Sequence, residues 1–208
     1  MSETKEDRAA AQAQAQFDSI RDLVAALECD YDRLEELREE RKQLVEEVTE
    51  LRAAYDEAAK AEDAAQNQAP DADYDLAKTA EDKRTAWEEK IEELAEWDAD
   101  NGEEYQELRE AAGDCADQDE ARERIQEDAL SVEVRSDWTT LGKPLEASEY
   151  CILLCTGGPA ARIVGDLGRG EPTSARLEYQ DWGTPWTEFV NCERDTLLSY
   201  ARCFYFGE

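Results

Sequence analysis

A seven-residue repeat of apolar side chains dominates the N-terminal part of this chain. One position of the repeat holds Ile20, Leu27, Leu34, Arg41, Val48 and Tyr55, and the position three residues later holds Leu23, Asp30, Leu37, Leu44, Leu51 and Ala58. This spacing, kept over about five heptads, is typical of a coiled coil or a long helical hairpin. No proline or glycine occurs in residues 1–69, so the sequence predicts helix through this stretch. Arg41 and Asp30 occupy otherwise apolar positions, where polar side chains cost stability but can set the register.

A second helix is expected after the segment Asn67–Asp73. Pro70 disfavours helical geometry at the preceding residue, and Asp71 or Asp73 can cap a new helix. The second repeat holds Ala77, Arg84, Ile91, Asp98, Tyr105 and Ala112 at one position, and Ala80, Trp87, Leu94, Asn101 and Leu108 at the other. A short connection between two long helices favours an antiparallel pair. One helix to about Ala112 and a kink at Asn101-Gly102 are both open, and a third short helix is predicted from about Asp117 to Ala129.

The periodicity changes near residue 130. Alternating or mostly apolar runs over 131–135, 149–156, 161–167, 176–181 and 187–190 predict strands separated by turns. Helical spacing returns in Leu197, Leu198, Tyr200, Ala201 and Phe204. We therefore predict an α+β protein. Residues 1–130 would form a long antiparallel helical hairpin of the coiled-coil type, and residues 131–208 a small antiparallel β-sheet domain with a C-terminal helix.

Acidic residues are concentrated in the first predicted domain. The 208-residue chain has 54 Asp and Glu against 23 Lys and Arg, a net charge of −31. Residues 1–130 hold 42 acids and 16 bases (net −26), and residues 131–208 hold 12 and 7 (net −5). A pI near 4.2 argues against direct binding to nucleic acid or anionic membranes. The mean hydropathy of −0.82 predicts no transmembrane span, and Met1–Asp7 lacks the apolar region of a signal peptide.

The residue types that most catalytic and metal sites need are scarce. Histidine is absent, which excludes Cys-His and Ser-His-Asp catalysis and removes the commonest zinc ligand. Cys151 and Cys155 would lie about 13 Å apart on a strand and could not share a zinc ion with Cys192 and Cys203. Those four are predicted to be buried free thiols, and Cys29 and Cys115 isolated ones. We predict no catalytic residue, cofactor or metal and no enzyme, with a carboxylate pair acting as acid and base as the open alternative.

The acidic helices suggest a binding role. A helix of about 60 residues is about 90 Å long, so the net charge of −26 gives about one charge per 3.5 Å, close to a single nucleic-acid strand. At this density the helices could occupy a basic groove as a nucleic-acid mimic. The carboxylates predicted to replace phosphates are Glu35, Glu36, Glu39, Glu40, Glu46, Glu47 and Glu50. An ordinary solvated coiled-coil surface and halophilic solubility are the alternatives, because Arg and Lys are interspersed.

A second candidate surface lies in residues 178–188, where two tryptophans flank a Gly-Thr-Pro turn. Tryptophan is enriched at binding hot spots. We therefore predict partner contacts from Tyr179, Asp181, Trp182 and Trp186. In the alternative interpretation, both indole rings cover the core of a small sheet.

Residues 178–188, together with the C-terminal run Leu197-Leu198-Ser199-Tyr200-Ala201-Arg202-Cys203-Phe204-Tyr205-Phe206-Gly207-Glu208, resemble a domain of small uncharacterised phage and mobile-element proteins. The resemblance covers the C-terminal domain and not the acidic helices, and it brings no catalytic residue. It implies a setting in which accessory proteins often counter host defence. It also implies a cytoplasmic location in a bacterial host.

The leading hypothesis is a non-enzymatic inhibitor whose acidic helices occupy the nucleic-acid groove of a basic host-defence protein, such as a nuclease or a CRISPR effector. The alternative is a structural or adaptor protein. Its coiled coil would dimerise, and its C-terminal domain would bind a protein partner. A homodimer through the helices is expected if the first helix outreaches the second by about 20 residues and leaves an apolar stripe uncovered.

Overall fold

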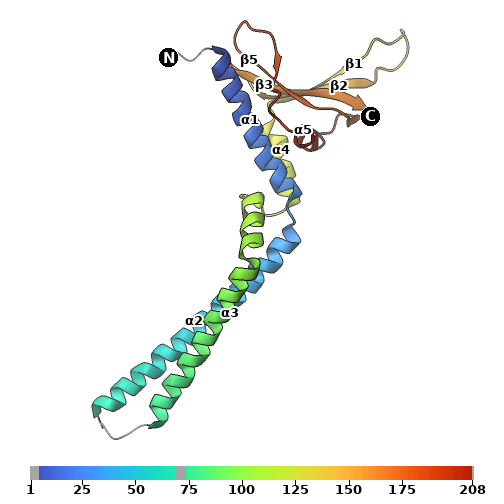
Figure 1. Cartoon of the computed structure of the whole chain (residues 1–208). Coiled ribbons are helices and arrows are strands. Elements are labelled where there is room, and N and C mark those ends of the chain that lie inside the picture. The colour runs from blue at the N-terminus through green and yellow to red at the C-terminus, as the bar shows by residue number, and fades with distance from the viewer. Residues whose placement is uncertain (1–4, 69–73, 208) are drawn as a thin grey trace. The chain divides into compact units, whose positions relative to one another are not determined.

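The computed structural model describes residues 5–68 and 74–207 (Figure 1). Its helices are α1 (Lys5–Glu28), α2 (Tyr31–Gln68), α3 (Tyr74–Ala112), α4 (Gln118–Asp128) and α5 (Arg194–Ala201). Its strands are β1 (Ser131–Ser136), β2 (Ala147–Cys155), β3 (Ala160–Gly168), β4 (Glu171–Pro172), β5 (Arg176–Gln180) and β6 (Thr187–Glu188). The predicted α+β fold class, with a helical hairpin, an antiparallel sheet and a C-terminal helix, is confirmed.

Two compact units divide the chain. The sheet unit comprises Met1–Cys29 and Ala111–Glu208, and the hairpin unit comprises Asp30–Glu110. This division differs from the boundary predicted at residue 130, because α1 and α4 belong with the strands. The hairpin unit is therefore an insertion between two segments that fold together.

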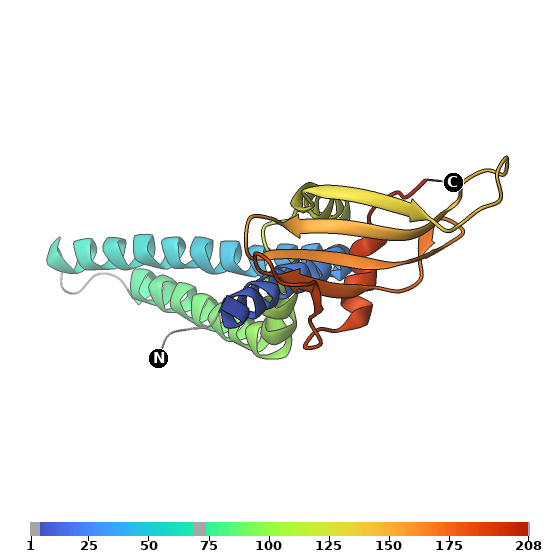
Figure 2. The same ribbon diagram turned by 90° about the horizontal axis from the view of Figure 1, so that it is seen from above.

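The strands form an antiparallel sheet with the order β1-β2-β3-β5-β6, and β4 pairs with β3 (Figure 2). Side chains alternate between the two faces of a sheet, so residues in register share a face. One row in register is Val132, Ile152, Ile163 and Leu177. The neighbouring row, on the opposite face, is Glu133, Cys151, Val164 and Arg176. The sheet thus has one apolar face and one polar face.

Helices α1, α4 and α5 cover the apolar face of the sheet (Figure 1). The buried cluster joins side chains of all three helices with the strands: Phe17, Ile20 and Val24 of α1, Ile125 of α4, Leu197 and Tyr200 of α5, and Ile152, Ile163 and Leu177 of the sheet. Burial of these side chains removes a large apolar area from water, which stabilises the unit. We call the other, polar face the open face.

Local sequence explains where α4 begins and how its end is held. Asp117 accepts a hydrogen bond from the Glu120 N–H at 2.8 Å, and Glu120 accepts one from the Ala116 N–H at 2.8 Å. The first bond is that of an N-cap residue, and the second resembles a capping box but involves the N–H one residue before the N-cap. Hydrogen bonds from the Ala116 backbone and the Arg124 side chain lower the pKa of Glu120. At the other end, the buried Tyr200 hydroxyl donates to Asp128 at 2.7 Å.

The single helix predicted over residues 1–69 is two helices in the structure. Asp30 Oδ1 accepts a hydrogen bond from the Arg33 N–H at 3.0 Å, as an N-cap residue does. Asp30 therefore begins α2 and does not set the register of a continuous coiled coil. The apolar residues of α1, such as Ile20 and Val24, pack on strands. The predicted helical homodimer depends on an apolar stripe of the first helix that the second helix leaves uncovered. In the structure, the strands of the sheet unit cover this stripe.

Helices α2 and α3 form the antiparallel hairpin. Leu34, Leu37 and Ala80 are buried in it. Helix α3 continues through Asn101-Gly102 without a kink large enough to interrupt it, and Asn101 Nδ2 donates to the Trp97 carbonyl at 3.2 Å. Ile91 was predicted to lie in the row of α3 residues that contacts α2, but it is 40% exposed. The neighbouring Lys90 lies in that row instead: its side chain is 22% exposed and contacts Glu47 of α2.

Two predictions concern residues outside the described ranges. These are the start of the chain at Met1–Thr4 and the caps Asp71 and Asp73. Within residues 5–68 and 74–207, no helix combines the length and the apolar character that crossing a bilayer requires.

Replacing Ile20 tests whether α1 belongs to the core of the sheet unit. Ile20 is 0% exposed, so Ile20→Ala should lower the free energy of unfolding by about 2–5 kcal/mol. Ile91→Ala is the matched control, because Ile91 holds the same predicted repeat position and is 40% exposed. The control should cost less than about 1 kcal/mol. Urea unfolding followed by circular dichroism measures both variants, and equal losses would contradict the placement of α1.

Candidate functional site

Polar and aromatic contacts join the two helices of the hairpin unit. Lys90 Nζ lies 2.7 Å from Glu47 Oε2. Trp97 Nε1 donates to Glu40 Oε2 at 3.1 Å. Further pairs across the interface are Arg33 with Glu104 (3.0 Å), Arg41 with Asp98 (2.9 Å) and the stacked rings of Tyr55 and Trp87 (5.8 Å). Several basic side chains of this unit are thereby directed toward the partner helix.

The seven acids predicted to imitate phosphates divide into three groups. Glu40 and Glu47 turn toward α3 and serve as hairpin contacts. Glu35, Glu36 and Glu39 pair within α2 with Arg38, Arg33 and Lys42 at 2.9, 3.4 and 3.3 Å. Hydrogen bonds from Lys42 and Gln43 hold the pKa of Glu39 below its usual value. Glu46 and Glu50 are exposed, so α2 presents an acidic surface interrupted by cations.

Helix α3 carries a more continuous acidic surface. We define the α3 stripe as a set of exposed acids on one side of this helix: Asp82, Glu89, Glu92, Glu93, Glu96, Asp100, Glu103, Glu107 and Glu110. Five of them recur at every seventh residue from 82 to 110, so they follow one another about 10.5 Å apart along the helix. Among the described residues, the ion pair that reaches this stripe joins Lys90 Nζ to Glu93 Oε2 at 2.6 Å. The stripe could have been predicted from the sequence, because its acids recur at every seventh residue.

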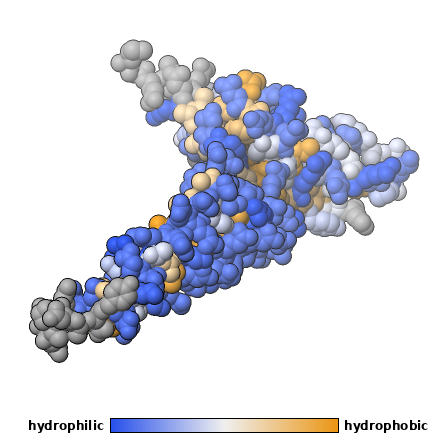
Figure 3. Space-filling view, turned by 60° about the horizontal axis from the view of Figure 1, so that its bottom comes forward, coloured by the Kyte–Doolittle hydropathy of each residue, from blue (hydrophilic) through white to orange (hydrophobic). Residues whose placement is uncertain are grey.

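The charge of the hairpin unit is high for its length. Residues 30–110 hold 29 Asp and Glu against 11 Lys and Arg, a net charge of −18. Helix α2 has 38 residues and is therefore about 57 Å long. The hairpin thus carries about one net charge per 3 Å, similar to the spacing of about 3.4 Å in one nucleic-acid strand. Figure 3 shows hydrophilic residues over most of the visible surface of this unit.

In the sheet unit, Trp182 is a predicted contact residue that reaches the surface. It is 75% exposed, and its ring lies on the backbone of the turn between β2 and β3. A Cβ atom at Gly158 would lie 1.9 Å from Trp182 Cδ1, and Gly158 has a φ of 121°. Only glycine permits this contact and this conformation. The ring also borders a hollow of about 190 Å³ next to Thr156 and Asp181.

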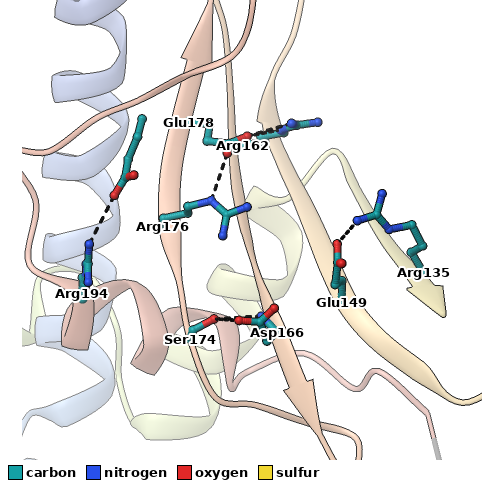
Figure 4. Close-up of polar contacts among 9 residues, drawn as sticks. Arg135, Glu149, Arg162, Asp166, Ser174, Arg176, Glu178 and Arg194 are labelled. Atoms are coloured by element: carbon teal, nitrogen blue, oxygen red, sulfur yellow. Dashed lines mark hydrogen bonds and ion pairs between the residues drawn. The ribbon is translucent and has the colours of Figure 1, made fainter. Parts of the chain in front are cut away.

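Trp186 lies on the open face of the sheet. The Arg162 guanidinium stacks over its ring at 4.0 Å. Arg162 Nη2 and Nε also donate to Glu178 Oε2 at 2.7 and 2.9 Å, and Arg176 donates to the other carboxylate oxygen at 3.1 Å (Figure 4). Burial by itself would raise the pKa of Glu178, but the hydrogen bonds from the two arginines hold it below its usual value.

Tyr179 and Asp181 have local structural roles. The Tyr179 ring packs edge-on against Phe189 at 6.3 Å, at the border of the core. Asp181 Oδ1 accepts a hydrogen bond from the Trp182 N–H at 2.7 Å, and the Asp181 N–H donates to Thr184 Oγ1 at 3.0 Å. The four residues predicted as one contact loop therefore do not form one surface.

The open face contains a shallow depression of about 400 Å³. Two polar pairs lie on this face: Arg135 with Glu149, and the Ser174 hydroxyl with Asp166 at 2.7 Å (Figure 4). Burial raises the pKa of the Cys151 thiol, so this thiol stays protonated near neutral pH. Across residues 5–68 and 74–207, no group of three or more Cys, Asp or Glu is placed to hold a metal ion. The depression thus combines the Arg135–Glu149 ion pair with a protonated thiol at Cys151.

Several exposed apolar residues of the sheet unit were not singled out from the sequence. Trp138 and Leu141 in the β1–β2 connection are fully exposed. Val132 and Val134 of β1 are 40% and 51% exposed. Their alternation with polar residues predicts a strand, but it does not reveal that the strand lies at an edge of the sheet.

Comparisons of the chain with protein-family models, with curated proteins and with solved structures find no match. The surfaces described above, the α3 stripe, the exposed Trp182 and the exposed side of β1, are therefore interpreted from their own geometry and chemistry.

Acidification should remove the stability that Glu178 contributes. Its pKa is lower in the folded protein than in the unfolded chain, where the pKa of glutamate is about 4.3. The contribution is therefore complete above about pH 5 and is lost as the pH falls through the folded pKa. Glu178→Gln should lower the unfolding free energy by about 1–3 kcal/mol near pH 7, and its difference from the wild type should shrink below about pH 4.

Denaturant unfolding across this pH range measures the effect. Glu171→Gln, which removes an exposed carboxylate of β4, is the control and should change little at any pH. A loss in Glu178→Gln that stays constant down to about pH 3.5 would contradict the assigned role of the ionised carboxylate.

Proposed function

We propose that this protein is a non-enzymatic binding protein whose acidic helical hairpin occupies the basic nucleic-acid groove of another protein. The observation that carries this proposal is the α3 stripe, in which an exposed acid recurs at every seventh residue from Asp82 to Glu110. Regularly spaced carboxylates offer a groove lined by Lys and Arg the kind of charge that it meets in a phosphate backbone.

The arrangement of cations within the hairpin unit supports this proposal. Lys90 contacts Glu47 of α2, and Arg41 contacts Asp98 across the interface. These cations are directed at the partner helix, so the solvent side of α3 keeps most of its negative charge. The net charge of −18 on the unit also disfavours nucleic acid itself as the ligand.

The α3 stripe takes the place of the α2 face as the main proposed contact. Of the acids predicted on α2, Glu46 and Glu50 remain candidates for secondary contacts, because the other five have partners within the hairpin unit. Trp182, exposed in the sheet unit, is a candidate for an additional apolar contact with the same partner.

The proposed partner is a basic nucleic-acid-binding protein of a bacterial host, such as a nuclease or a CRISPR effector. This part of the proposal depends on the resemblance of residues 178–188 and 197–208 to phage and mobile-element proteins. By this analogy the protein would inhibit host defence in the bacterial cytoplasm. The charge argument for the α3 stripe does not depend on that setting.

Neutralising the α3 stripe should greatly weaken partner binding. The triple variant Glu89→Gln/Glu96→Gln/Glu103→Gln removes three charges from exposed helix positions. Its affinity should fall about tenfold or more, and the salt dependence of binding should become shallower. Capture from bacterial lysate at about 0.1 M salt, with identification by mass, supplies the partner. Fluorescence anisotropy then measures whether the protein displaces labelled duplex DNA from that partner.

A second triple variant controls for net charge. Glu123→Gln/Glu146→Gln/Glu171→Gln removes the same charge from exposed positions of the sheet unit and should keep the affinity of the wild type. Equal losses in the two variants would contradict the assignment to the α3 stripe. Two results would contradict the proposed mimicry. One is undiminished binding of the partner by the first variant, and the other is failure of the protein to displace the partner from DNA.

An adaptor that binds a protein partner through the sheet unit is the second candidate function. The exposed Trp182 and the fully exposed Trp138 and Leu141 favour it. Large exposed apolar side chains can act as interface anchors, and their binding does not require acidic residues.

The variant Trp182→Ala separates the two candidate functions. Because Trp182 is 75% exposed, its loss should leave the fold intact. For an adaptor, Trp182→Ala should lower the captured amount at least about fivefold, whereas the stripe variant and about 0.5 M salt should not. Unchanged capture by Trp182→Ala, together with loss at high salt, would contradict the adaptor function.

A further inference from the structure

Strand β1 is a free edge of the sheet. It stands first in the strand order, and among the described residues β2 is the strand that pairs with it. Its valines are exposed, Val132 at 40% and Val134 at 51%, and Leu130 just before the strand is 58% exposed. An edge strand presents unpaired backbone N–H and C=O groups, and exposed apolar side chains favour its pairing with another strand.

The two faces of β1 differ in chemistry. The register with β2 places Val132 and Val134 on the face that the helices cover elsewhere in the sheet. Glu133 and Arg135 lie on the open face, where Arg135 pairs with Glu149 of β2 (Figure 4). The edge therefore presents an acid followed by a base on one face, and apolar side chains on the other.

We propose that β1 of a second copy of this chain pairs antiparallel with β1, about a two-fold axis through Val134. In this register Val134 lies opposite Val134 of the second copy. Glu133 lies opposite Arg135 of the second copy, and the symmetry repeats this pair. The sheet would then continue across the interface into the sheet of the second copy.

Charge complementarity selects this register. Two residues that lie opposite one another in an antiparallel ladder point their N–H and C=O groups either both toward the partner strand or both away from it. Successive residues of one strand point these groups in opposite directions, so a residue cannot lie opposite its own neighbour in the second copy. A two-fold axis must therefore place one residue opposite itself. An axis through Glu133 would oppose two glutamates, and an axis through Arg135 would oppose two arginines. Like charges directly opposite one another are destabilising. An axis through Val132 would oppose Glu133 and Ser131, so the axis through Val134 is the one within this charged segment that pairs unlike charges.

The same register covers the apolar side of the edge. Strand β1 ends at Ser136; if the second copy extended the pairing to residue 138, Leu130 would lie opposite Trp138, and both residues are exposed in the single chain. A stable interface buries about 1,200 Å² or more, which is more than a short pair of strands supplies through its backbone. Contacts from Leu130, Val132, Val134 and Trp138 of both copies would provide the additional area.

The charges of the open face also continue across the interface. Arg135 would lie between two carboxylates, Glu149 of its own chain and Glu133 of the second copy. The net charge of −31 on each copy opposes association at long range. Salt near 0.15 M screens charges more than about 8 Å apart, so the pairing should be measured there. This dimer uses the sheet unit, does not involve α2 or α3, and is independent of the proposed partner of the hairpin.

Charge exchange at the edge tests the proposal. In Glu133→Arg every cross-strand charge pair becomes two arginines, and in Arg135→Glu every pair becomes two glutamates. Each variant alone should dimerise at least about tenfold more weakly than the wild type. An equimolar mixture of the two variants should form a heterodimer close to the wild type in affinity, because each pair is again unlike. Analytical ultracentrifugation of the full chains, from about 1 to 300 µM, measures all four samples.

Two further variants keep the test specific. Glu171→Arg makes the same change in charge as Glu133→Arg at an exposed residue away from β1, and it should leave dimerisation unchanged. Opposed Cα atoms in an antiparallel ladder lie about 4.5–5.5 Å apart, within the range that a disulfide spans. Mild oxidation of Val134→Cys should therefore link two copies through that residue. Mass spectrometry of the linked peptides distinguishes this product from links through the six native cysteines.

Three outcomes would overturn the proposal. The first is a wild-type chain that stays monomeric up to the highest concentration, as expected if a strand of a different protein occupies this edge. The second is a dimer that neither Glu133→Arg nor Arg135→Glu weakens, as expected for association through the helices. The third is a mixture of these two variants that remains monomeric although each variant folds, as judged by circular dichroism.

Discussion

Phe17, Ile20 and Val24 of α1 pack on the apolar face of the sheet, and this contact closes the core of the sheet unit. The apolar face would otherwise expose strand residues such as Ile152 and Leu177 to water at a large cost in free energy. Because α1 precedes the hairpin in the chain and the strands follow it, the same contact brings two distant segments into one unit. The insertion of Asp30–Glu110 between them is a direct consequence.

This insertion separates the two kinds of surface in the protein. The sheet unit has a conventional buried core, whereas in the hairpin unit few apolar side chains are buried and polar pairs such as Lys90–Glu47 join the helices. An elongated helical pair can carry a net charge of −18 because its charges are spread along its length and face solvent. The acidic surface is therefore a property of the inserted hairpin, which the core of the sheet unit does not need.

The polar face of the sheet shows how the remaining charges are used. Glu178 receives hydrogen bonds from Arg162 and Arg176, and Arg162 also stacks on Trp186. These groups satisfy one another within the sheet. At the β1 edge the pattern ends with Glu133 and Arg135, beside which no strand lies among the described residues. The proposed dimer edge and the proposed hairpin contact lie on different units.

The sequence by itself determined most of the helices and strands, because their periodicity and turn residues act locally: the second repeat predicts α3, and the run at 149–156 predicts β2. It did not reveal the break between α1 and α2 or the short strand β4. It also contained the α3 stripe as an acid at every seventh residue. Tertiary structure decided the partner of each apolar face. Ile20 keeps the same heptad spacing whether it packs on a helix or on a sheet, so the sequence alone could not show which of these it contacts. The N-cap role of Asp30 could not be derived from the sequence either. The contact of Trp182 with Gly158 and the edge position of β1 likewise depend on segments that meet only in the folded chain, where long-range packing selects among locally equivalent choices.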